Sequence, residues 1–595
     1  MGSGSADLLV LREGDDVAVA TRDLRGGEEV SASGRAFVVR SDVPRGHKIA
    51  MSDVGTGGLV RKYGQAIGMA TSDIVAGDHV HSHNLVFDDD AALALRRDDT
   101  SGRGAPGPEA GGSAPGTAFG GGVTPSAAGE RLTFRGYPRA DGRVGTRNYL
   151  AILTSVNCSA STAKMIADQF RGAALDEFPN VDGVIALTHT SGCGMVPESE
   201  GGQMLLRTLR GHAAHPNVAG LLVLGLGCEM VPGAALSARS GASVDLGMPA
   251  MPAPGRTATG STSGETPAVA GHEVAAASSG GAPSSGVIGS GGVDPGVDAG
   301  LLASIPADTV VRSLTIQETG GVRATVRAGV AAVRAMLPEL NARERVECDA
   351  SELVLALNCG GSDGYSGITA NPALGWASDR LVELGAASVL AETPEVYGAE
   401  HLLAARATEP AVAEKLFGRI EWWREYVAAG GGTLDNNPSP GNKAGGLTTI
   451  LEKSLGAVAK GGTAPMSAVY EYAEPIEPHV GFSFMDTPGY DPVSVTGLVA
   501  GGANVVVFTT GRGSVFGCRP SPSIKVATNT PMYERMSEDM DVNAGVIVDG
   551  EATVADVGRV ILDRILAVAS GERTVSEDLG IGAEEFIPWH VGAVT

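Results

Sequence analysis

Short apolar stretches alternate with polar and turn-forming residues over the first ninety residues of the chain. Three of them, FVVR at 37–40, HKIA at 47–50 and HVHSHNLV at 79–86, have the length and alternation that are typical of strands. Gly and Asp residues separate these stretches and favour turns. The pattern predicts a compact all-β domain over residues 1–90.

Longer apolar runs begin after residue 131. YLAILTSV, GVIALTH and GLLVLGLG have the pattern of buried strands, and helical stretches such as ASTAKMIADQFRG lie between them. Strands that alternate with helices predict a parallel sheet covered by helices. Because the alternation resumes after about residue 300, we expect two α/β domains, at 131–345 and 346–595.

Composition modifies this picture in two places. The chain of 595 residues contains 86 Gly and 32 Pro, many of which lie at 91–130 and at about 237–299. These tracts cannot bury enough apolar surface to become ordered. We therefore expect a flexible linker at 91–130 and a disordered insertion at 237–299 within the first α/β domain.

Acidic residues outnumber basic ones, 68 against 44, and the formal net charge is −24 at pH 7. Nucleic acids and anionic membranes need clustered Lys and Arg, so we exclude both as partners. A small anionic substrate is compatible with the charge if its pocket is locally positive. No apolar run approaches 18 residues, and the N-terminus lacks the pattern of a signal peptide. We expect a cytoplasmic protein, and the sequence leaves a homo-oligomer open.

Three histidines alternate in one short segment. His79, His81 and His83 would share one face of a strand, because side chains at i, i+2 and i+4 point the same way. Imidazoles bind Fe, Mn or Zn, so the spacing indicates a transition-metal site. Three ligands from one straight strand give an awkward geometry, and another segment would have to contribute. The alternative is a solvated polar face.

Two basic segments are candidates for acid/base chemistry or anion binding. His47 and Lys48 combine an acid/base group with a cation, although such a pair also occurs in ordinary exposed turns. Arg143, Arg147 and Asn148 follow Gly-rich backbone just before a predicted strand, where guanidinium groups suit a carboxylate. The alternative for these arginines is pairing with acidic residues of the chain.

Gly-rich turns follow several predicted strands and carry a cysteine together with small polar residues. In open α/β sheets, ligands bind at the carboxyl ends of strands. The residues in such turns are Cys158, Cys193, Cys359, Ser362, Asp363 and Arg512. The six cysteines lie far apart without a CxxC pair, which argues against a disulfide framework and a zinc ribbon. The alternative for a cysteine here is a small apolar filler. No phosphate-binding or dinucleotide-binding fingerprint is present.

A polar segment at 436–453 begins a predicted helix. Asn442 and Lys443 lie near its start, where backbone N–H groups and a cation favour an anion. An ordinary capped helix is the alternative.

Long segments of the chain, almost without gaps, share the pattern of one family. They are GHKIA, KYGQAIG, GDHVHSHNL, GYPRADGRVGTRNYLAILTSVNCSA, GCGM, LNCGGSDGYSGITANPALG, ETPEVYGAEHLL, NNPSPGNKAGGLTTILEKSLGAVAKGGT, FMDTPGYDPVSVTGLVAGGAN and TTGRGSVFGCRPSPSIKVATNTPMY. Together they resemble the altronate/galactarate dehydratase family, and the altronate branch more closely. The resemblance implies a β-clip (SAF) domain followed by a large α/β part. It also implies loss of water from a six-carbon sugar acid such as D-altronate, giving 2-keto-3-deoxy-D-gluconate, with Fe(II) or Mn(II).

On this basis we predict an active site between the β domain and the α/β part. His79, His81 and His83 would supply metal ligands, and His47 or Lys48 would transfer the proton. The predicted substrate-binding residues are Arg143, Arg147, Asn148, Cys158, Cys193, Cys359, Ser362, Asp363, Asn442, Lys443 and Arg512. Galactarate dehydration, a sulfolactate-type sulfo-lyase and a non-catalytic sugar-acid binding module are the alternatives.

Overall fold

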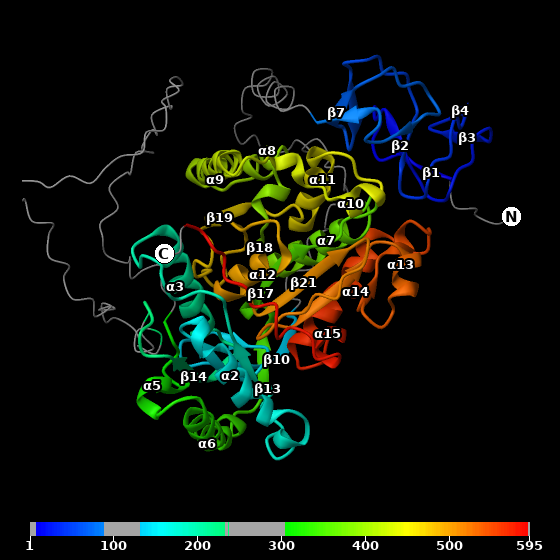
Figure 1. The fold of residues 1–595 in the computed structure, drawn as a ribbon. Helices are drawn as coiled ribbons and strands as arrows, with labels where there is room; N and C mark the ends of the chain where they lie inside the picture. The colour runs from blue at the N-terminus through cyan, green and yellow to red at the C-terminus, as the bar shows by residue number, and fades with distance from the viewer. Residues whose placement is uncertain (1–6, 88–130, 232–235, 237–303, 593–595) are drawn as a thin grey trace, which may run out of the picture.

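A computed structural model of the chain describes residues 7–87, 131–231, 236 and 304–592 (Figure 1). The predicted linker at 91–130 and the predicted insertion at 237–299 lie outside the described residues. Within the described part, no helix is both long and apolar enough to cross a membrane.

The N-terminal residues form a small all-β module, as predicted. Its alternating valines and isoleucines, among them Val17, Val19 and Ile67, are fully or almost fully buried. One antiparallel sheet has the order β1-β2-β5-β8, a second has the order β6-β7-β9, and β3 and β4 form a hairpin. The strands are β1 (Leu8–Leu9), β2 (Val17–Ala20), β3 (Glu29–Ala32), β4 (Arg35–Val38), β5 (Lys48–Ala50), β6 (Leu59–Lys62), β7 (Gln65–Ala70), β8 (His79–Val80) and β9 (Leu85–Val86).

The segment at 79–86 differs from the prediction of one continuous strand. β8 ends at Val80, and residues 81–84 form a turn before β9. The Asn84 side-chain oxygen accepts the backbone N–H of His81 at 2.9 Å, and the N–H groups of Asn84 and Leu85 donate to the His81 carbonyl. An Asn side chain that bonds nearby backbone competes with strand pairing, which explains the turn.

The middle part of the chain contains a four-stranded parallel sheet of order β13-β12-β14-β15. Leu205, Leu206 and Leu209 of α3 pack on one face, and residues of α2 and α6 pack on the other. The elements are β12 (Tyr149–Thr154), β13 (Gly183–Leu187), β14 (Val218–Gly225), β15 (Val310–Thr315), α2 (Ala160–Ala167), α3 (Glu200–Ala213), α5 (Ile316–Thr319) and α6 (Val322–Asn341). A separate antiparallel sheet joins β10 (Thr133–Pro138) to β11 (Val144–Gly145) and β16 (Val346–Asp349).

The C-terminal part contains a seven-stranded parallel sheet of order β19-β20-β18-β17-β21-β22-β23. α7 and α14 pack on one face of the sheet and α12 on the other. The strands are β17 (Val354–Cys359), β18 (Ala387–Leu390), β19 (Met466–Tyr470), β20 (Phe482–Met485), β21 (Val505–Thr510), β22 (Ser523–Ala527) and β23 (Val542–Asn543). The helices are α7 (Ala370–Glu383), α8 (Glu400–Ala404), α9 (Pro410–Ala429), α10 (Pro440–Ala444), α11 (Ile450–Ala457), α12 (Asp491–Ala500), α13 (Thr530–Arg535), α14 (Val554–Ala569) and α15 (Val575–Asp578). The predicted fold class is therefore confirmed.

The strand order fixes where this sheet can bind a ligand. The first strand, β17, lies in the centre; β18 follows on one side, and β21 lies on the other. The loops after β17 and β21 meet where the order reverses, because Gly511 and Arg512 donate their N–H groups to the Gly361 carbonyl. Such a switch point at the carboxyl ends is the usual ligand crevice of an open α/β sheet.

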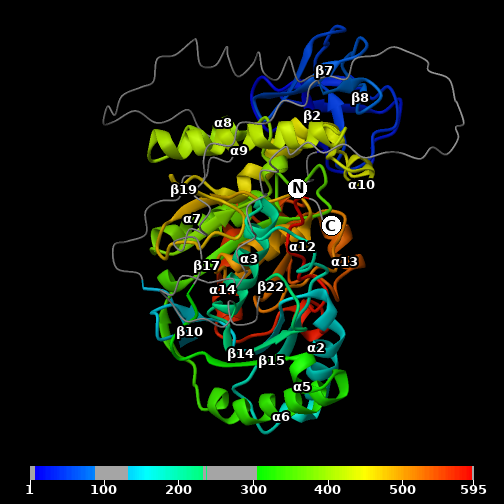
Figure 2. The same ribbon diagram turned by 60° about the vertical axis from the view of Figure 1, so that its left-hand side comes forward.

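The β module lies against this edge of the C-terminal sheet. Figure 1 shows the module next to α10 and α11, and Figure 2 again shows it next to α10. The Tyr365 hydroxyl donates to the Ala20 carbonyl at 2.6 Å, and the Thr449 hydroxyl donates to the Ile67 carbonyl at 2.5 Å. The fold therefore brings the histidines of the module to the crevice of the sheet.

Candidate functional site

Four imidazoles gather where the β module faces α10. The ring centroids of His47, His79 and His81 lie 5.0–5.4 Å apart, and His83 lies 5.4 Å from His79. His47 directly precedes β5 and His79 begins the neighbouring strand β8, while the turn described above returns the other two rings to the same place. The predicted gathering of the three histidines is found, with His47 as a fourth member.

Backbone carbonyls of the α10 segment fix the orientation of two of these rings. His81 Nε2 lies 2.9 Å from the Lys443 carbonyl, and His47 Nε2 lies 3.4 Å from the Ala444 carbonyl. A carbonyl only accepts, so each of these Nε2 nitrogens carries the proton and each Nδ1 carries the lone pair. The Ser82 hydroxyl lies 3.0 Å from His81 Nδ1. His47 Nδ1 lies 3.0 Å from His79 Nε2.

The surroundings of His47, His79 and His81 favour the neutral form of these three imidazoles. Burial, followed by the charges of His81 and Lys48, lowers the pKa of His47 to about 4. Burial and the neighbouring imidazoles lower the pKa of His79 to about 3, and burial also lowers the pKa of His81. Neutral imidazole is the form that binds a metal ion.

A buried ion network fixes the module below the histidines. Lys48 Nζ lies 2.8 Å from Glu452 of α11 and donates to the Gly446 carbonyl, while Lys62 Nζ lies 2.8 Å from the other oxygen of Glu452. All three side chains are fully or almost fully buried. Burial lowers the pKa of Lys48 to about 8, whereas the two lysines outweigh burial and hold the pKa of Glu452 well below its ordinary value.

The C-terminal sheet contributes the opposite wall. Asn442 donates to the Ser362 carbonyl at 2.8 Å, which ties α10 to the loop after β17. Asp363 in that loop is buried and accepts bonds from Thr528 at 2.9 Å and Asn529 at 3.0 Å. Burial raises the pKa of Asp363. Ser362, Asp363 and Asn442 therefore shape the crevice by holding its loops together.

Two cations border the same segment. A side-chain carbon added at Gly445 would lie 3.1 Å from Arg512 Cδ, and one added at Gly446 would lie 3.3 Å from His47 Cδ2. Arg512 is exposed and Lys443 is half-buried. Neither side chain has an ion-pair or hydrogen-bond partner among the residues that the structure describes. Histidines and unpaired cations thus flank one short glycine segment.

A second, fully buried group lies beside the crevice at the ends of β17 and β18. Ligand atoms of Cys359, Glu392 and Glu395 lie within 4.8 Å of one another. Lys460 Nζ lies 2.8 Å from the Cys359 sulfur and 3.0 Å from Glu392, and Lys453 Nζ lies 2.6 Å from Glu395. Lys460 and Lys453 therefore neutralise the charges of the two carboxylates without a metal ion.

The backbone conformation of Glu392 and the protonation of the neighbouring Asp491 are both unusual. Glu392 has a φ of +71°, an uncommon backbone conformation for a residue other than glycine. Burial, together with the charges of Glu392 and Glu395, raises the pKa of Asp491 to about 8, so its carboxyl is mostly protonated at pH 7. Sequence reasoning missed these residues, although ETPE directly after a predicted strand could have flagged both glutamates.

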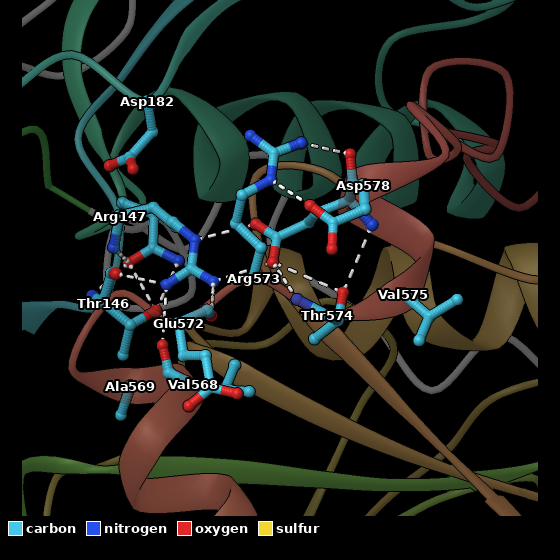
Figure 3. Close-up of polar contacts among 12 residues, drawn as sticks. Thr146, Arg147, Asp182, Val568, Ala569, Glu572, Arg573, Thr574, Val575 and Asp578 are labelled. Atoms are coloured by element: carbon cyan, nitrogen blue, oxygen red, sulfur yellow. Dashed lines mark hydrogen bonds and ion pairs between the residues drawn. The ribbon is translucent and has the colours of Figure 1, made fainter. Parts of the chain in front are cut away.

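Arg143, Arg147 and Asn148 lie elsewhere, at the amino edge of the middle sheet. Arg147 is 1% exposed and forms two bonds of 2.7 Å with Glu577. Its other N–H groups donate to the carbonyls of Thr146, Val568 and Glu572 (Figure 3). Arg143 bonds Asp141 and the Ala214 carbonyl, and Asn148 bonds Arg139 and two carbonyls. The structure does not bring these three residues to the histidines.

Cys158 and Cys193 also lie apart from the histidines, at the carboxyl edge of the middle sheet. Both are exposed, in the loops after β12 and β13. They share this edge with Cys228, which follows β14.

Comparison with known proteins covers almost the whole chain. Residues 6–88 match the altronate/galactarate dehydratase SAF domain, residues 136–250 match the second domain of D-galactarate dehydratase/altronate hydrolase, and residues 350–594 match the C-terminal domain of D-galactarate/altronate dehydratase. The chain is 31% identical over 569 residues to the altronate dehydratase of Bacillus subtilis (strain 168), covering 95% of each chain. It is 32% identical over 568 residues to the altronate dehydratase of Escherichia coli (strain K12), again covering 95% of each. Identity to the galactarate dehydratase (L-threo-forming) of the same strain is 33% over 584 residues, covering 97% of this chain and 95% of the relative.

These matches extend from the β module through both parallel sheets and agree with the resemblance predicted from the sequence. The chain therefore belongs to the D-galactarate/altronate dehydratase family of hydro-lyases.

Proposed function

We propose that this hydro-lyase removes water from a six-carbon sugar acid such as D-altronate, giving 2-keto-3-deoxy-D-gluconate, and that it requires a divalent metal, Fe(II) or alternatively Mn(II). One observation carries the proposal: neutral imidazoles of the β module and the cations Lys443 and Arg512, which have no ion-pair partner in the described part of the chain, flank the same segment at 442–446. Relatives named altronate dehydratase and galactarate dehydratase support the substrate class. Their sequence identities to this chain, 31–33%, are too similar to separate the two substrates.

The donor set of the histidine cluster fits a divalent transition metal. His79, His81 and His83 would hold it, because neutral imidazoles suit Fe(II) and Mn(II) and two of the rings have lowered pKa values. The Lys443 carbonyl would fix the tautomer and orientation of His81, as outer-shell acceptors do for metal-binding imidazoles. Such an ion supplies Lewis acidity to the oxygens of a bound sugar acid.

The chain's own residues would bind the substrate and move its proton. Arg512 and Lys443 pair with the carboxylate, which keeps C2 near the imidazoles. His47 takes the C2 proton at Nδ1, since its Nε2 proton is held by the Ala444 carbonyl, and the substrate would take the place of His79 Nε2 as the partner of Nδ1. The electron pair of the broken C–H bond forms the C2–C3 double bond, the C3–O bond breaks, and the 3-hydroxyl leaves as water with the proton that His47 returns. The resulting enol then becomes the 2-keto acid.

Lys48 fits a positioning role better than a proton-transfer role. Its Nζ is enclosed by Glu452 and the Gly446 carbonyl and is fully buried. It holds β5 against α11, and thereby places the adjacent His47. We therefore assign the proton transfer to His47.

The test is an anaerobic assay of the full chain after reconstitution with Fe(II) or Mn(II). D-altronate, galactarate and sulfolactate are supplied separately, and 2-keto-3-deoxy acids and sulfite are measured. A metal-dependent 2-keto-3-deoxy acid from D-altronate is the expected result. Product from galactarate alone would show that the proposed substrate is wrong, and sulfite from sulfolactate would show that the proposed reaction is wrong. Binding without turnover of any sugar acid would contradict the enzymatic proposal and indicate a binding module.

A further inference from the structure

Three exposed cysteines lie at one edge of the middle sheet. Cys158, Cys193 and Cys228 follow β12, β13 and β14, which are adjacent in the order β13-β12-β14. The register pairs Leu153 with Leu187 and Thr154 with Leu224, so the three strands end at the same level. The other three cysteines of the chain are buried.

Hydrogen bonds join the three loops into one surface. The Asn157 backbone N–H donates to the Ser191 carbonyl at 2.9 Å, which links the first two loops. Met230 N–H donates to the Gly192 carbonyl at 3.2 Å, and the Ser155 hydroxyl donates to Glu229 at 2.9 Å. The loops are thus built as a unit, and each carries one thiol.

Glycines permit this close approach. Gly192 has a φ of +96°, and a side-chain carbon there would lie 2.4 Å from the Ser155 carbonyl oxygen. Gly227 has a φ of +120°, and a side-chain carbon there would lie 2.5 Å from Gln317. Any larger residue would push the loops apart, so the chain maintains tightly packed backbone around the thiols.

Two titratable side chains of these loops, His189 and Glu229, are already engaged in hydrogen bonds. His189 uses one ring nitrogen on the Thr154 carbonyl and the other on the Ser191 N–H. The Glu229 carboxylate accepts bonds from Ser155, Gly227 and Cys228. Within the described parts of the three loops, the three exposed cysteines are therefore the soft ligands that can bind as thiolates, whereas the Met195 sulfur accepts a bond from the Ser191 hydroxyl.

A single metal ion and a metal cluster need different spacings of their sulfur ligands. A tetrahedral zinc ion with Zn–S bonds of about 2.3 Å would hold its sulfurs roughly 3.8 Å apart. Among the described residues, the three sulfurs do not form a group whose ligand atoms all lie within 4.8 Å of one another. An iron–sulfur cluster suits wider spacing, because each thiolate binds a different iron.

We propose that Cys158, Cys193 and Cys228 bind a [4Fe–4S] cluster through three of its irons, leaving the fourth iron without a protein ligand. The thiols lose their protons on binding. The fourth iron is then open to an oxygen ligand such as a carboxylate or a hydroxyl. The inference concerns a cofactor and residues separate from the histidine cluster and stands whether or not the proposed dehydration is correct.

The test uses the full chain, purified and reconstituted anaerobically with ferrous iron, sulfide and a thiol reductant. Iron, acid-labile sulfide and zinc are quantified per chain, and the charge-transfer absorption and electron paramagnetic resonance of the reduced protein are recorded. We compare the wild type with Cys158→Ser, Cys193→Ser and Cys228→Ser. Cys348→Ser, a buried thiol outside these loops, is the matched control, and circular dichroism and thermal melting report on folding.

The expected result is about four irons and four sulfides per chain in the wild type and in Cys348→Ser. Each of the three loop variants should lose most of this cluster while melting like the wild type. His81→Gln should keep the cluster even if it loses turnover, which separates this inference from the proposed function. A folded wild type without sulfide, a single bound zinc, or loop variants that retain the full cluster would overturn the inference.

Discussion

Two arginines from the predicted substrate-binding set differ in their surroundings. Arg147 is 1% exposed, and all its N–H groups have partners, including the Glu577 carboxylate. Arg512 is exposed and its guanidinium has no partner in the described part of the chain. The first precedes β12 and the second follows β21. The arginine at the amino edge of its parallel sheet pairs with other parts of the protein, whereas the arginine at the carboxyl edge is available to a ligand.

The largest effect of this contrast should appear in stability. Arg147→Met leaves Glu577 buried without its cation, and breaking a buried pair typically costs about 3–5 kcal/mol. The free energy of unfolding from urea titration measures it. The control Arg131→Met removes an exposed pair with Asp349 and should cost about 1 kcal/mol or less. Equal losses in the two variants would contradict the structural role of Arg147.

Arg512→Ala should produce the opposite profile. Loss of a charge-assisted contact costs about 1.5–3 kcal/mol, so kcat/KM should fall roughly 10- to 150-fold. The melting temperature should stay unchanged, because this side chain has no described partner in the protein. Steady-state kinetics with D-altronate provide the measurement, and the exposed Arg171→Ala serves as the control. Unchanged kinetics would remove Arg512 from the site.

The Arg147–Glu577 pair should also respond to pH, with a smaller effect. Burial alone would raise the pKa of Glu577, but the hydrogen bond and charge of Arg147 lower it below its ordinary value of 4.5. The stability from this carboxylate is therefore complete above pH 4.5 and is lost as the pH falls through the folded-state pKa. Unfolding free energies of the wild type and Glu577→Gln should converge on acidification. A difference that stays constant or grows would contradict this coupling.

The sequence predicted the classes of structure and one functional cluster. Alternating apolar positions indicated the β module, and strand–helix alternation indicated the parallel sheets. The histidines were predicted to meet on a continuous strand, yet a turn made by Asn84 brings them together. Local periodicity could not show this, because a side-chain bond to the backbone determines it.

Other features depend on contacts between distant segments. Glu452 meets Lys48 and Lys62 across about four hundred residues, and nothing near it in the sequence indicates the pairing. Lys460 likewise donates to the sulfur of Cys359, which lies 101 residues earlier in the sequence. The position of Arg147 before a strand was visible in the sequence and would have favoured a structural role.

The most direct measurement of the central claim is Fe(II)-dependent turnover of His81→Gln beside His479→Asn. His479 is exposed, lies away from the cluster and has a φ of +61°, which Asn tolerates. We expect His81→Gln to fold normally but to form the keto acid roughly 100-fold more slowly or worse. His479→Asn should match the wild type. A folded His81→Gln enzyme with wild-type turnover would contradict an active site at the interface of the β module.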